Sequence, residues 1–345
     1  MKRLLVCGLF VAAGCSDALE QDTTAGQVVA VVNTNPATLS LVSASRFSAT
    51  TFDLLNAASR PATVAGRVSV LAVPLPAVDS IVFLDFGSSG AGRRVPLAVG
   101  AGAAGVVIAD ESTAWVVNPN NDRATWVNYG TGDTTSIAVG PTPQAVAVTR
   151  RTLYVVNANL SGSVPVGPSS ISWRALGVAV QPVTLPTIPL TGINAQFAVV
   201  GGDSLLYVVD RGSPGAGDGK LSIVDPAINQ EVVVINGLGE LPGPAVFHPS
   251  GRLLIASEHE GILEVNTLTR TLVRGVGAGS KPGGHGVAAL ALDQRGRIYA
   301  LDRGDCTGPG VVHVLSAPPD YAELETVSVG ACPSAAAAVF MQAAP

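Results

Sequence analysis

Short apolar runs that end in a polar residue recur along the chain. Each run is about five residues long and closes mostly on Asn or Asp, whose side chain favours a turn and so ends a strand. In chain order, the copies are Val29–Asn33, Ala114–Asn118, Leu153–Asn157, Leu206–Asp210, Leu253–Ser257 and Ile298–Asp302. Their recurrence at a spacing of tens of residues indicates an internal structural repeat.

The segments around these runs recur as well. A Gly- or Pro-rich stretch and an alternating strand come before the run, as in Gly140–Pro143 followed by Gln144–Val148. Two further strands come after it, as in Lys220–Asp225 and Asn229–Ile235. Short turns between successive strands favour antiparallel hairpins. The repeat is therefore a unit of four strands: an inner strand, the polar-ended strand, a third strand and an outer strand.

Counting inner strands gives the number of units. They are expected to begin near Pro61, Ala104, Gln144, Gln196, Ala245, Val287 and Ser334, which are 40 to 52 residues apart. This spacing is typical of propeller blades.

The two ends of the chain complement each other. The last inner strand, Ala335–Phe340, has no strands after it, and the first strand, Gln27–Val32, lacks an inner strand before it. If the two pair, they complete one blade and close the ring, which removes open sheet edges. We therefore predict an all-β fold, a single seven-bladed β-propeller of four-stranded blades over residues 27–345. An open β-solenoid and a two-sheet sandwich are the alternatives.

The runs Tyr154–Asn157 and Tyr207–Asp210 resemble the YVTN-repeat β-propellers, in which a Tyr-Val-x-Asn-like run closes the second strand of each blade. The resemblance covers about residues 100–335, and it is degenerate from 27 to 100. It implies a seven-bladed propeller. Members of that family are often without known activity, so it also implies a binding role.

The N-terminus is typical of an export signal. A basic start, Met1–Arg3, precedes the apolar stretch Leu4–Ala13. Small residues then lead to Cys15, which resembles the lipobox of bacterial lipoproteins. The resemblance implies a signal peptide over 1–14, a lipid on Cys15 and a flexible tether over 15–26. Ser16 after the cysteine favours the outer membrane or the cell surface. Ordinary signal cleavage without lipid is the alternative.

The cysteines also indicate export. Cys7 leaves with the signal peptide and Cys15 is the lipid site, so Cys306 and Cys332 remain as an even pair. Both fall in loops of the same predicted face, and an oxidising compartment favours disulfides. We predict that they form a disulfide, with two buried free thiols as the alternative.

Charge and motifs exclude several function classes. The formal net charge is -5 and no basic stripe occurs, so no nucleic-acid partner is expected. Gly100–Gly105 matches the dinucleotide fingerprint, but the strand-like Val106–Ile108 follows where the fingerprint needs a helix. No apolar run after the N-terminus is long enough to span a membrane. We expect that the protein binds no cofactor and no metal and that it is a monomer.

A ligand site is expected on one face of the disc. Loops that enter inner strands and loops that leave polar-ended strands meet there, around the mouth of the central channel. The candidate residues on this face are Arg211, Glu258, His259, Lys281, His285 and Arg303. Arginines that converge can hold a carboxylate or phosphate, and a His beside carboxylates can act as a base or a metal ligand. The alternative is that the Asx residues cap turns, that the arginines pair with neighbouring Asp and that the histidines are only solvated.

Two functions fit these expectations. The first is a non-catalytic, membrane-anchored binding protein of the bacterial cell envelope, with a protein, peptide, glycan or small molecule as partner. The second is a metal-dependent hydrolase resembling the propeller lactonases. That resemblance needs a Glu, an Asn and an Asp at the axis, for which Glu258, Asn157 or Asn194, and Asp302 are the candidates, although their blade positions differ from that family's. A third interpretation, a subunit resembling amine dehydrogenase heavy chains, has no evidence of a quinone partner in the sequence.

Overall fold

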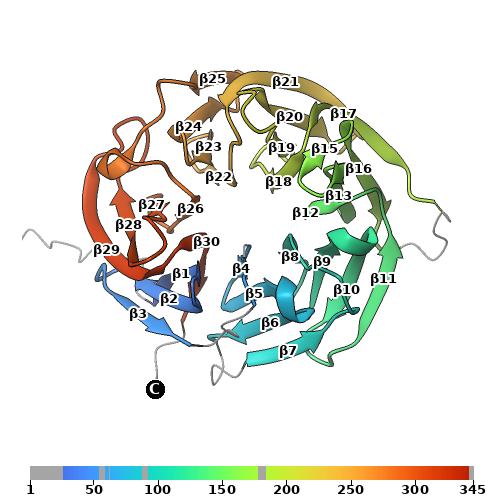
Figure 1. Cartoon of the computed structure of the whole chain (residues 1–345), viewed down its shortest axis with the longest axis horizontal. Coiled ribbons are helices and arrows are strands. Elements are labelled where there is room, and N and C mark those ends of the chain that lie inside the picture. The colour runs from blue at the N-terminus through green and yellow to red at the C-terminus, as the bar shows by residue number, and fades with distance from the viewer. Residues whose placement is uncertain (1–25, 54–58, 62, 88–91, 178–183, 342–345) are drawn as a thin grey trace, which may run out of the picture.

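The computed structural model describes residues 26–53, 59–61, 63–87, 92–177 and 184–341. The predicted signal peptide, Cys15 and all but the last residue of the predicted tether lie outside them. Within the described residues, seven four-stranded antiparallel sheets and one two-stranded ribbon are present. The seven sheets stand around a central opening (Figure 1). This confirms the seven-bladed propeller.

Four rings of strands make up the disc. The inner strands are β30 (Pro333–Phe340), β4 (Ala65–Arg67), β8 (Val106–Ile108), β12 (Pro143–Thr149), β18 (Ala195–Val200), β22 (Ala245–His248) and β26 (Ala289–Leu292). The second strands are β1 (Gln27–Thr34), β5 (Val70–Leu75), β9 (Thr113–Asn118), β13 (Thr152–Asn157), β19 (Leu206–Asp210), β23 (Arg252–Ser257) and β27 (Ile298–Asp302). All of them except β5, which ends at Leu75, carry the polar residue at or next to their last position. Blades 1 to 7 are numbered below in this order.

The third strands are β2 (Ala37–Ser43), β6 (Ser80–Asp85), β10 (Arg123–Asn128), β16 (Pro168–Ala175), β20 (Gly219–Asp225), β24 (Gly261–Asn266) and β28 (Pro309–Leu315). The outer strands are β3 (Ala49–Phe52), β7 (Gly92–Pro96), β11 (Thr134–Ala138), β17 (Thr187–Ile193), β21 (Gln230–Gly239), β25 (Thr271–Arg274) and β29 (Glu323–Ala331). The described 3-10 helices are η1 (Pro76–Val78), η2 (Pro119–Asn121) and η3 (Pro282–Gly284).

The C-terminal strand closes the ring. β30 pairs antiparallel with β1, with Gln27 opposite Phe340 and Asn33 opposite Pro333. The Met341 backbone N–H donates to the Gly26 carbonyl at 2.7 Å, so the pairing extends to the first described residue. Blade 1 thus combines three strands from the start of the chain with one from its end, as the sequence predicted.

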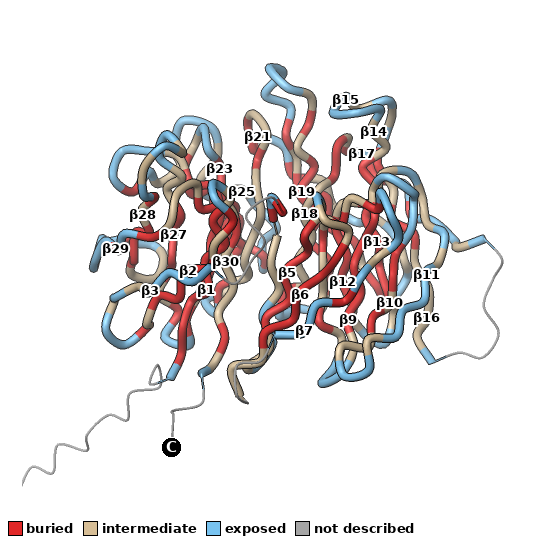
Figure 2. Tube along the Cα trace, turned by 60° about the horizontal axis from the view of Figure 1, so that its bottom comes forward, coloured by how far each residue is buried: buried red, intermediate tan, exposed pale blue. Residues whose placement is uncertain are grey.

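Apolar side chains fill the space between neighbouring blades. The second strands are buried along most of their length (Figure 2). The outer strands are largely exposed, as in β3 and β11, or alternate between buried and exposed residues, as in β17. The tyrosines of the YVTN-like runs, Tyr154, Tyr207 and Tyr299, are almost completely buried. Tyr154 of blade 4 reaches blade 5, where its hydroxyl donates to the Asn229 side chain at 2.7 Å. The repeated tyrosine therefore packs one blade on the next.

The first inner strand and blade 4 differ from the prediction. The inner strand expected to begin near Pro61 begins at Ala65 and has only three residues. Blade 4 also carries the unpredicted two-stranded ribbon, β14 (Leu160–Ser161) and β15 (Val164–Pro165), between β13 and β16.

Among the described residues, no helix has the length and apolarity needed to cross a bilayer.

Candidate functional site

The polar residue that ends the second strand joins that strand to the third. Asn33 lies opposite Thr38 in the β1–β2 ladder, and its Nδ2 donates to the Oγ of Ser40, two residues further along the same face, at 2.9 Å. The same offset recurs in three more blades, as Asn118 with Thr125, Asn157 with Ser172 and Asp210 with Ser222. All four Asx side chains are buried. Their positions are therefore structural and are not open to a ligand.

Blade 7 places ionisable groups at the equivalent positions. Asp302 takes the Asx position and His313 stands where the other blades have a hydroxyl, with His313 Nε2 at 4.0 Å from Asp302 Oδ2. His285 Nδ1 contacts the same Asp302 oxygen at 2.5 Å, and His313 Nδ1 contacts Glu323 Oε2 at 2.7 Å. Burial raises the pKa of Asp302, but hydrogen bonds from the Gly304 N–H and His285 outweigh it and hold the pKa below its usual range.

Arg211 is held at the channel mouth by uncharged groups. Its Nε donates to the Pro242 carbonyl and its Nη1 to Gln196 Oε1, each at 3.2 Å, and its Nη2 donates to the Leu241 carbonyl at 3.5 Å. The guanidinium also lies 5.9 Å from the centre of the Phe197 ring. Burial lowers the pKa of Arg211, yet an arginine keeps its charge in proteins. A half-buried cation is thus fixed in place by neutral acceptors.

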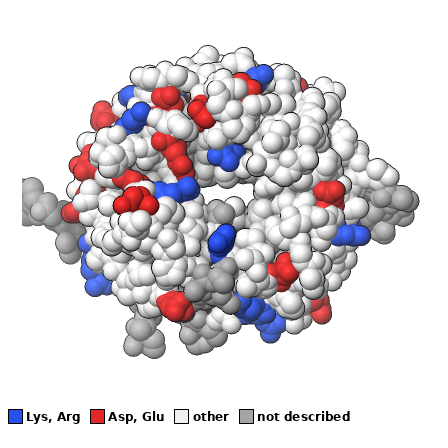
Figure 3. All heavy atoms as spheres, in the orientation of Figure 1, with Lys and Arg blue, Asp and Glu red and all other residues white. Residues whose placement is uncertain are grey.

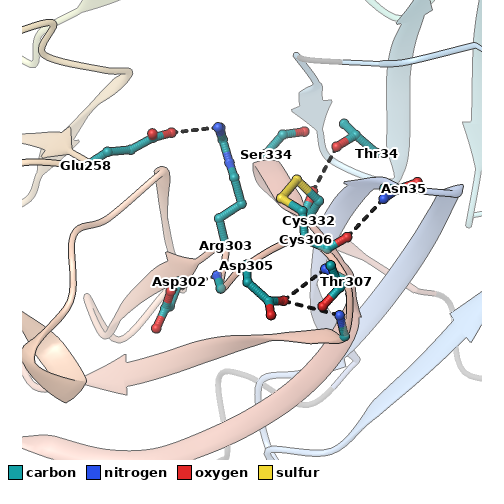
Figure 4. Close-up of a disulfide and its surroundings, with 12 residues drawn as sticks. Thr34, Asn35, Glu258, Asp302, Arg303, Asp305, Cys306, Thr307, Cys332 and Ser334 are labelled. Atoms are coloured by element: carbon teal, nitrogen blue, oxygen red, sulfur yellow. Dashed lines mark hydrogen bonds and ion pairs between the residues drawn. A yellow bond between two sulfur atoms is a disulfide. The ribbon is translucent and has the colours of Figure 1, made fainter.

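Arg303 lies near Arg211 but has an acidic partner. Its Nη1 is 2.8 Å from Glu258 Oε1, across from blade 7 to blade 6 (Figure 4). The nearby Glu258 carboxylate raises the pKa of Arg211 and the nearby Arg303 guanidinium lowers it, so the three charges influence one another. Among the described residues that line the channel, two arginines and one carboxylate are present, and the carboxylate pairs with Arg303, not with Arg211. Figure 3 shows charged side chains of both signs at the rim of the central opening.

The predicted disulfide is confirmed and lies beside this cluster. Cys306 and Cys332 are bonded, and they join the β27–β28 loop to the segment that leads into β30 (Figure 4). The Asn35 side chain donates to the Cys306 carbonyl at 2.9 Å, and the Thr34 hydroxyl donates to the Cys332 carbonyl at 3.1 Å. The bond therefore fastens the Arg303 loop to the seam where the ring closes.

The channel behind the mouth has a volume of about 960 Å³. It is lined by all seven inner strands, and its charged or ionisable lining residues within the described chain are Arg211, Glu258, His259 and Arg303. Cavities of 300 to 1,000 Å³ are typical of small-molecule sites. The central channel is thus large enough to hold a ligand.

The other two candidates lie outside the channel. The side chain of His285 is 67% exposed and pairs with Asp302, and Lys281 is exposed on the preceding link between blades 6 and 7.

Sequence reasoning missed Ser334, which lines the mouth, and the pair of His313 with Glu323. A signal for Ser334 existed, since a polar residue interrupts an otherwise small apolar run. His313 gave no signal, because its partner Asp302 lies on another strand.

The residues considered for a lactonase-type metal site have other partners. Asn157 bonds to the third strand of its own blade, Glu258 pairs with Arg303, and the Asn194 amide donates to the Gly212 carbonyl at 2.9 Å. In the described part of the chain, no group of three or more His, Cys, Asp or Glu side chains is arranged to hold a metal ion.

Solved structures share the fold at low sequence identity. Hydrazine synthase from Kuenenia stuttgartiensis matches with a TM-score of 0.64 and 14% identity, over 83% of this chain and 91% of that chain. A protein of unknown function from Desulfotomaculum acetoxidans matches with a TM-score of 0.65 and 13% identity, over 91% and 99%. Virginiamycin B lyase from Staphylococcus aureus matches with a TM-score of 0.60 and 9% identity, over 81% and 87%.

No protein-family model and no curated protein matches the chain. The similar structures therefore establish the propeller architecture, and any function has to be argued from the residues of this chain.

Proposed function

We propose that this chain is a non-catalytic binding protein of the YVTN-repeat propeller type, and that it binds a ligand bearing a carboxylate or phosphate at the channel mouth. Arg211 carries the proposal. Its three donor nitrogens are held by two carbonyls and an amide, so its charge is not neutralised by a contacting carboxylate. A guanidinium fixed in this way presents its charge to an anion without needing to reorganise.

The neighbouring charges support the same ligand class. Glu258 neutralises one of the two arginines through its 2.8 Å contact with Arg303. An incoming anion can take the place of Glu258 beside Arg303 while it balances the charge of Arg211. Hydrogen bonds between ionised partners are about twice as strong as neutral ones, so this exchange favours a charged ligand group.

We further propose that the protein is exported and anchored to the bacterial membrane through a lipid on Cys15. The disulfide between Cys306 and Cys332 supports export, because such bonds persist in oxidising compartments. The short tether between Cys15 and β1 would keep the disc close to the membrane surface.

Calorimetric titration of the full chain with inorganic phosphate and with acetate tests the binding proposal. Arg211→Gln should weaken anion binding about 10- to 100-fold, the value of a charge-assisted hydrogen bond. Glu258→Gln should strengthen binding, because it removes the carboxylate that competes for Arg303. Arg46→Gln is the matched control, since Arg46 is an exposed arginine in the β2–β3 turn on the opposite face.

Equal anion affinity in wild type and Arg211→Gln would overturn the proposal. So would a stoichiometric divalent ion in the purified protein whose removal by chelator lowers the melting temperature. That second result would favour the hydrolase resembling propeller lactonases. An increase in affinity on Glu258→Gln cannot come from structural damage, so it separates ligand binding from a purely structural role of the cluster.

A further inference from the structure

Polar lining side chains of the channel are confined to its mouth. In the described chain they are Thr63, Gln144, Gln196, Arg211, Glu258, His259, Arg303 and Ser334. Each lies in a link before an inner strand, near the start of an inner strand, or just after a second strand. All of these positions are at the same face of the disc, because inner strands begin and second strands end there.

Three of these residues are directed to the channel by the same device. Gln144, Gln196 and Ser334 each occupy a register shift near the start of an inner strand, between residues that pair normally with the second strand. A bulge of this kind re-aims a side chain and is common next to functional sites. The mouth therefore has polar groups placed by backbone irregularity in blades 1, 4 and 5.

Below the mouth, the lining side chains are apolar. The inner strands present small and aliphatic residues to the channel, such as Val106, Val146, Ala198, Val246 and Ala336. Each inner strand is the last strand of its sheet, so no further strand pairs with its channel edge. At two points this edge bonds to a neighbouring blade, through the Gln144 carbonyl and the Phe340 N–H. The wall can thus cover an apolar body and can satisfy a few polar substituents through backbone groups.

From this division we infer that the ligand is an amphiphilic organic anion, whose acidic group binds at Arg211 and Arg303 and whose apolar part enters the channel. The inference rests on the proposed anion site and adds the chemistry of the rest of the ligand. The volume of about 960 Å³ accommodates a molecule much larger than phosphate or acetate. Burying its apolar part would displace water from the Ala and Val wall, which stabilises the complex.

Straight-chain carboxylates from acetate to decanoate, titrated into the full chain by calorimetry below their micelle concentrations, test this inference. The affinity should rise about three- to fourfold for each added methylene group as the chain fills the channel. Decanol, which has the same chain and no charge, should bind at least tenfold more weakly than decanoate. Arg211→Gln should weaken the binding of every carboxylate by a similar factor and should leave the increase of affinity with chain length unchanged.

A second variant locates the apolar part. Ala198→Leu narrows the channel within β18, where Ala198 is half-buried, and should reduce decanoate affinity while acetate affinity stays the same. Melting temperatures of both variants check that they fold. The chain-length series on the wild type does not depend on either variant.

The outcomes separate the two proposals. If carboxylate binding depends on Arg211 but its affinity does not increase with chain length, the proposal of an amphiphilic ligand is overturned and the proposed anion site stands. Equal binding of decanol and decanoate, unaffected by Arg211→Gln, would overturn the anion site and with it this inference. Absence of binding by every probe would overturn both.

Discussion

Asp210 provides a prediction that can be worked out from the structure. In blades 1, 3 and 4 the equivalent position is Asn, and in blade 7 it is Asp302, which is partly exposed. In blade 5 it is a fully buried Asp. Asp210 is 1% exposed, and its Oδ2 accepts a hydrogen bond from Ser222 at 2.6 Å. Burial raises its pKa to about 7, despite the bond from Ser222. The folded protein therefore retains a neutral carboxyl where other blades have an amide.

The sign of the effect follows from proton binding. In the unfolded chain, Asp210 has a pKa of about 3.9, so it ionises at lower pH than in the folded state. Below pH 4 both states hold the proton, and the raised pKa costs nothing. Between pH 4 and 7 only the unfolded state loses it, so stability falls as pH rises, and above pH 7 the loss is constant. A pKa difference of about three units, at about 1.4 kcal/mol per unit, lowers the free energy of unfolding above pH 7 by about 4 kcal/mol.

Asp210→Asn should remove this pH dependence. The difference in melting temperature between the variant and wild type, followed by circular dichroism, should be near zero at pH 4 and grow to about 6 °C by pH 8. Comparing the two proteins at each pH cancels the contribution of other carboxylates. Asn157→Asp is the matched control, and it should introduce the same loss of stability in blade 4. A difference that stays constant from pH 4 to 8 would refute the reasoning.

Three further predictions concern the ring and its anchor. Replacing Cys306 and Cys332 by Ser should lower the free energy of unfolding by about 3 kcal/mol in a urea titration, since the bond closes a loop with a sequence separation of 26; an unchanged midpoint would contradict this. Gly192→Ala should lower the free energy of unfolding by more than about 2 kcal/mol in the same assay, because the added Cβ would lie 2.1 Å from the carboxyl carbon of Asp210 in the next blade. Gly308→Ala is the control and should change the free energy of unfolding little, because no atom lies within 4 Å of the added Cβ. Palmitate labelling should be lost in Cys15→Ala, and label retained in that variant would disprove the anchor.

The architecture was predictable because local patterns carry it. The polar-ended runs mark each second strand, their spacing gives the blade number, and the unmatched first and last strands, β1 and β30, indicate how the ring closes. The disulfide followed from counting cysteines and from the face on which their loops lie. Each of these features depends on a few consecutive residues or on the order of strands.

The contacts between strands and blades were not predictable in the same way. The role of Asn33 depends on Ser40, which is identified as its partner only when the β1–β2 register is known. Glu264 of β24 is another example, because it is 2% exposed and pairs with Arg252 of β23 and Arg274 of β25. It also accepts a 2.6 Å hydrogen bond from Tyr321 of blade 7, and the sequence pattern marks none of these contacts. Likewise, the neutral surroundings of Arg211 come from carbonyls in a link that no side-chain pattern marks.

Crystals of the full chain soaked with decanoate would show where an amphiphilic anion binds. We predict a carboxylate within hydrogen-bond distance of the guanidinium groups of Arg211 and Arg303, with the alkyl chain directed down the channel between the inner strands. Decanoate bound elsewhere, or with its carboxylate at the opposite face of the disc, would contradict the assignment of the mouth as the binding site.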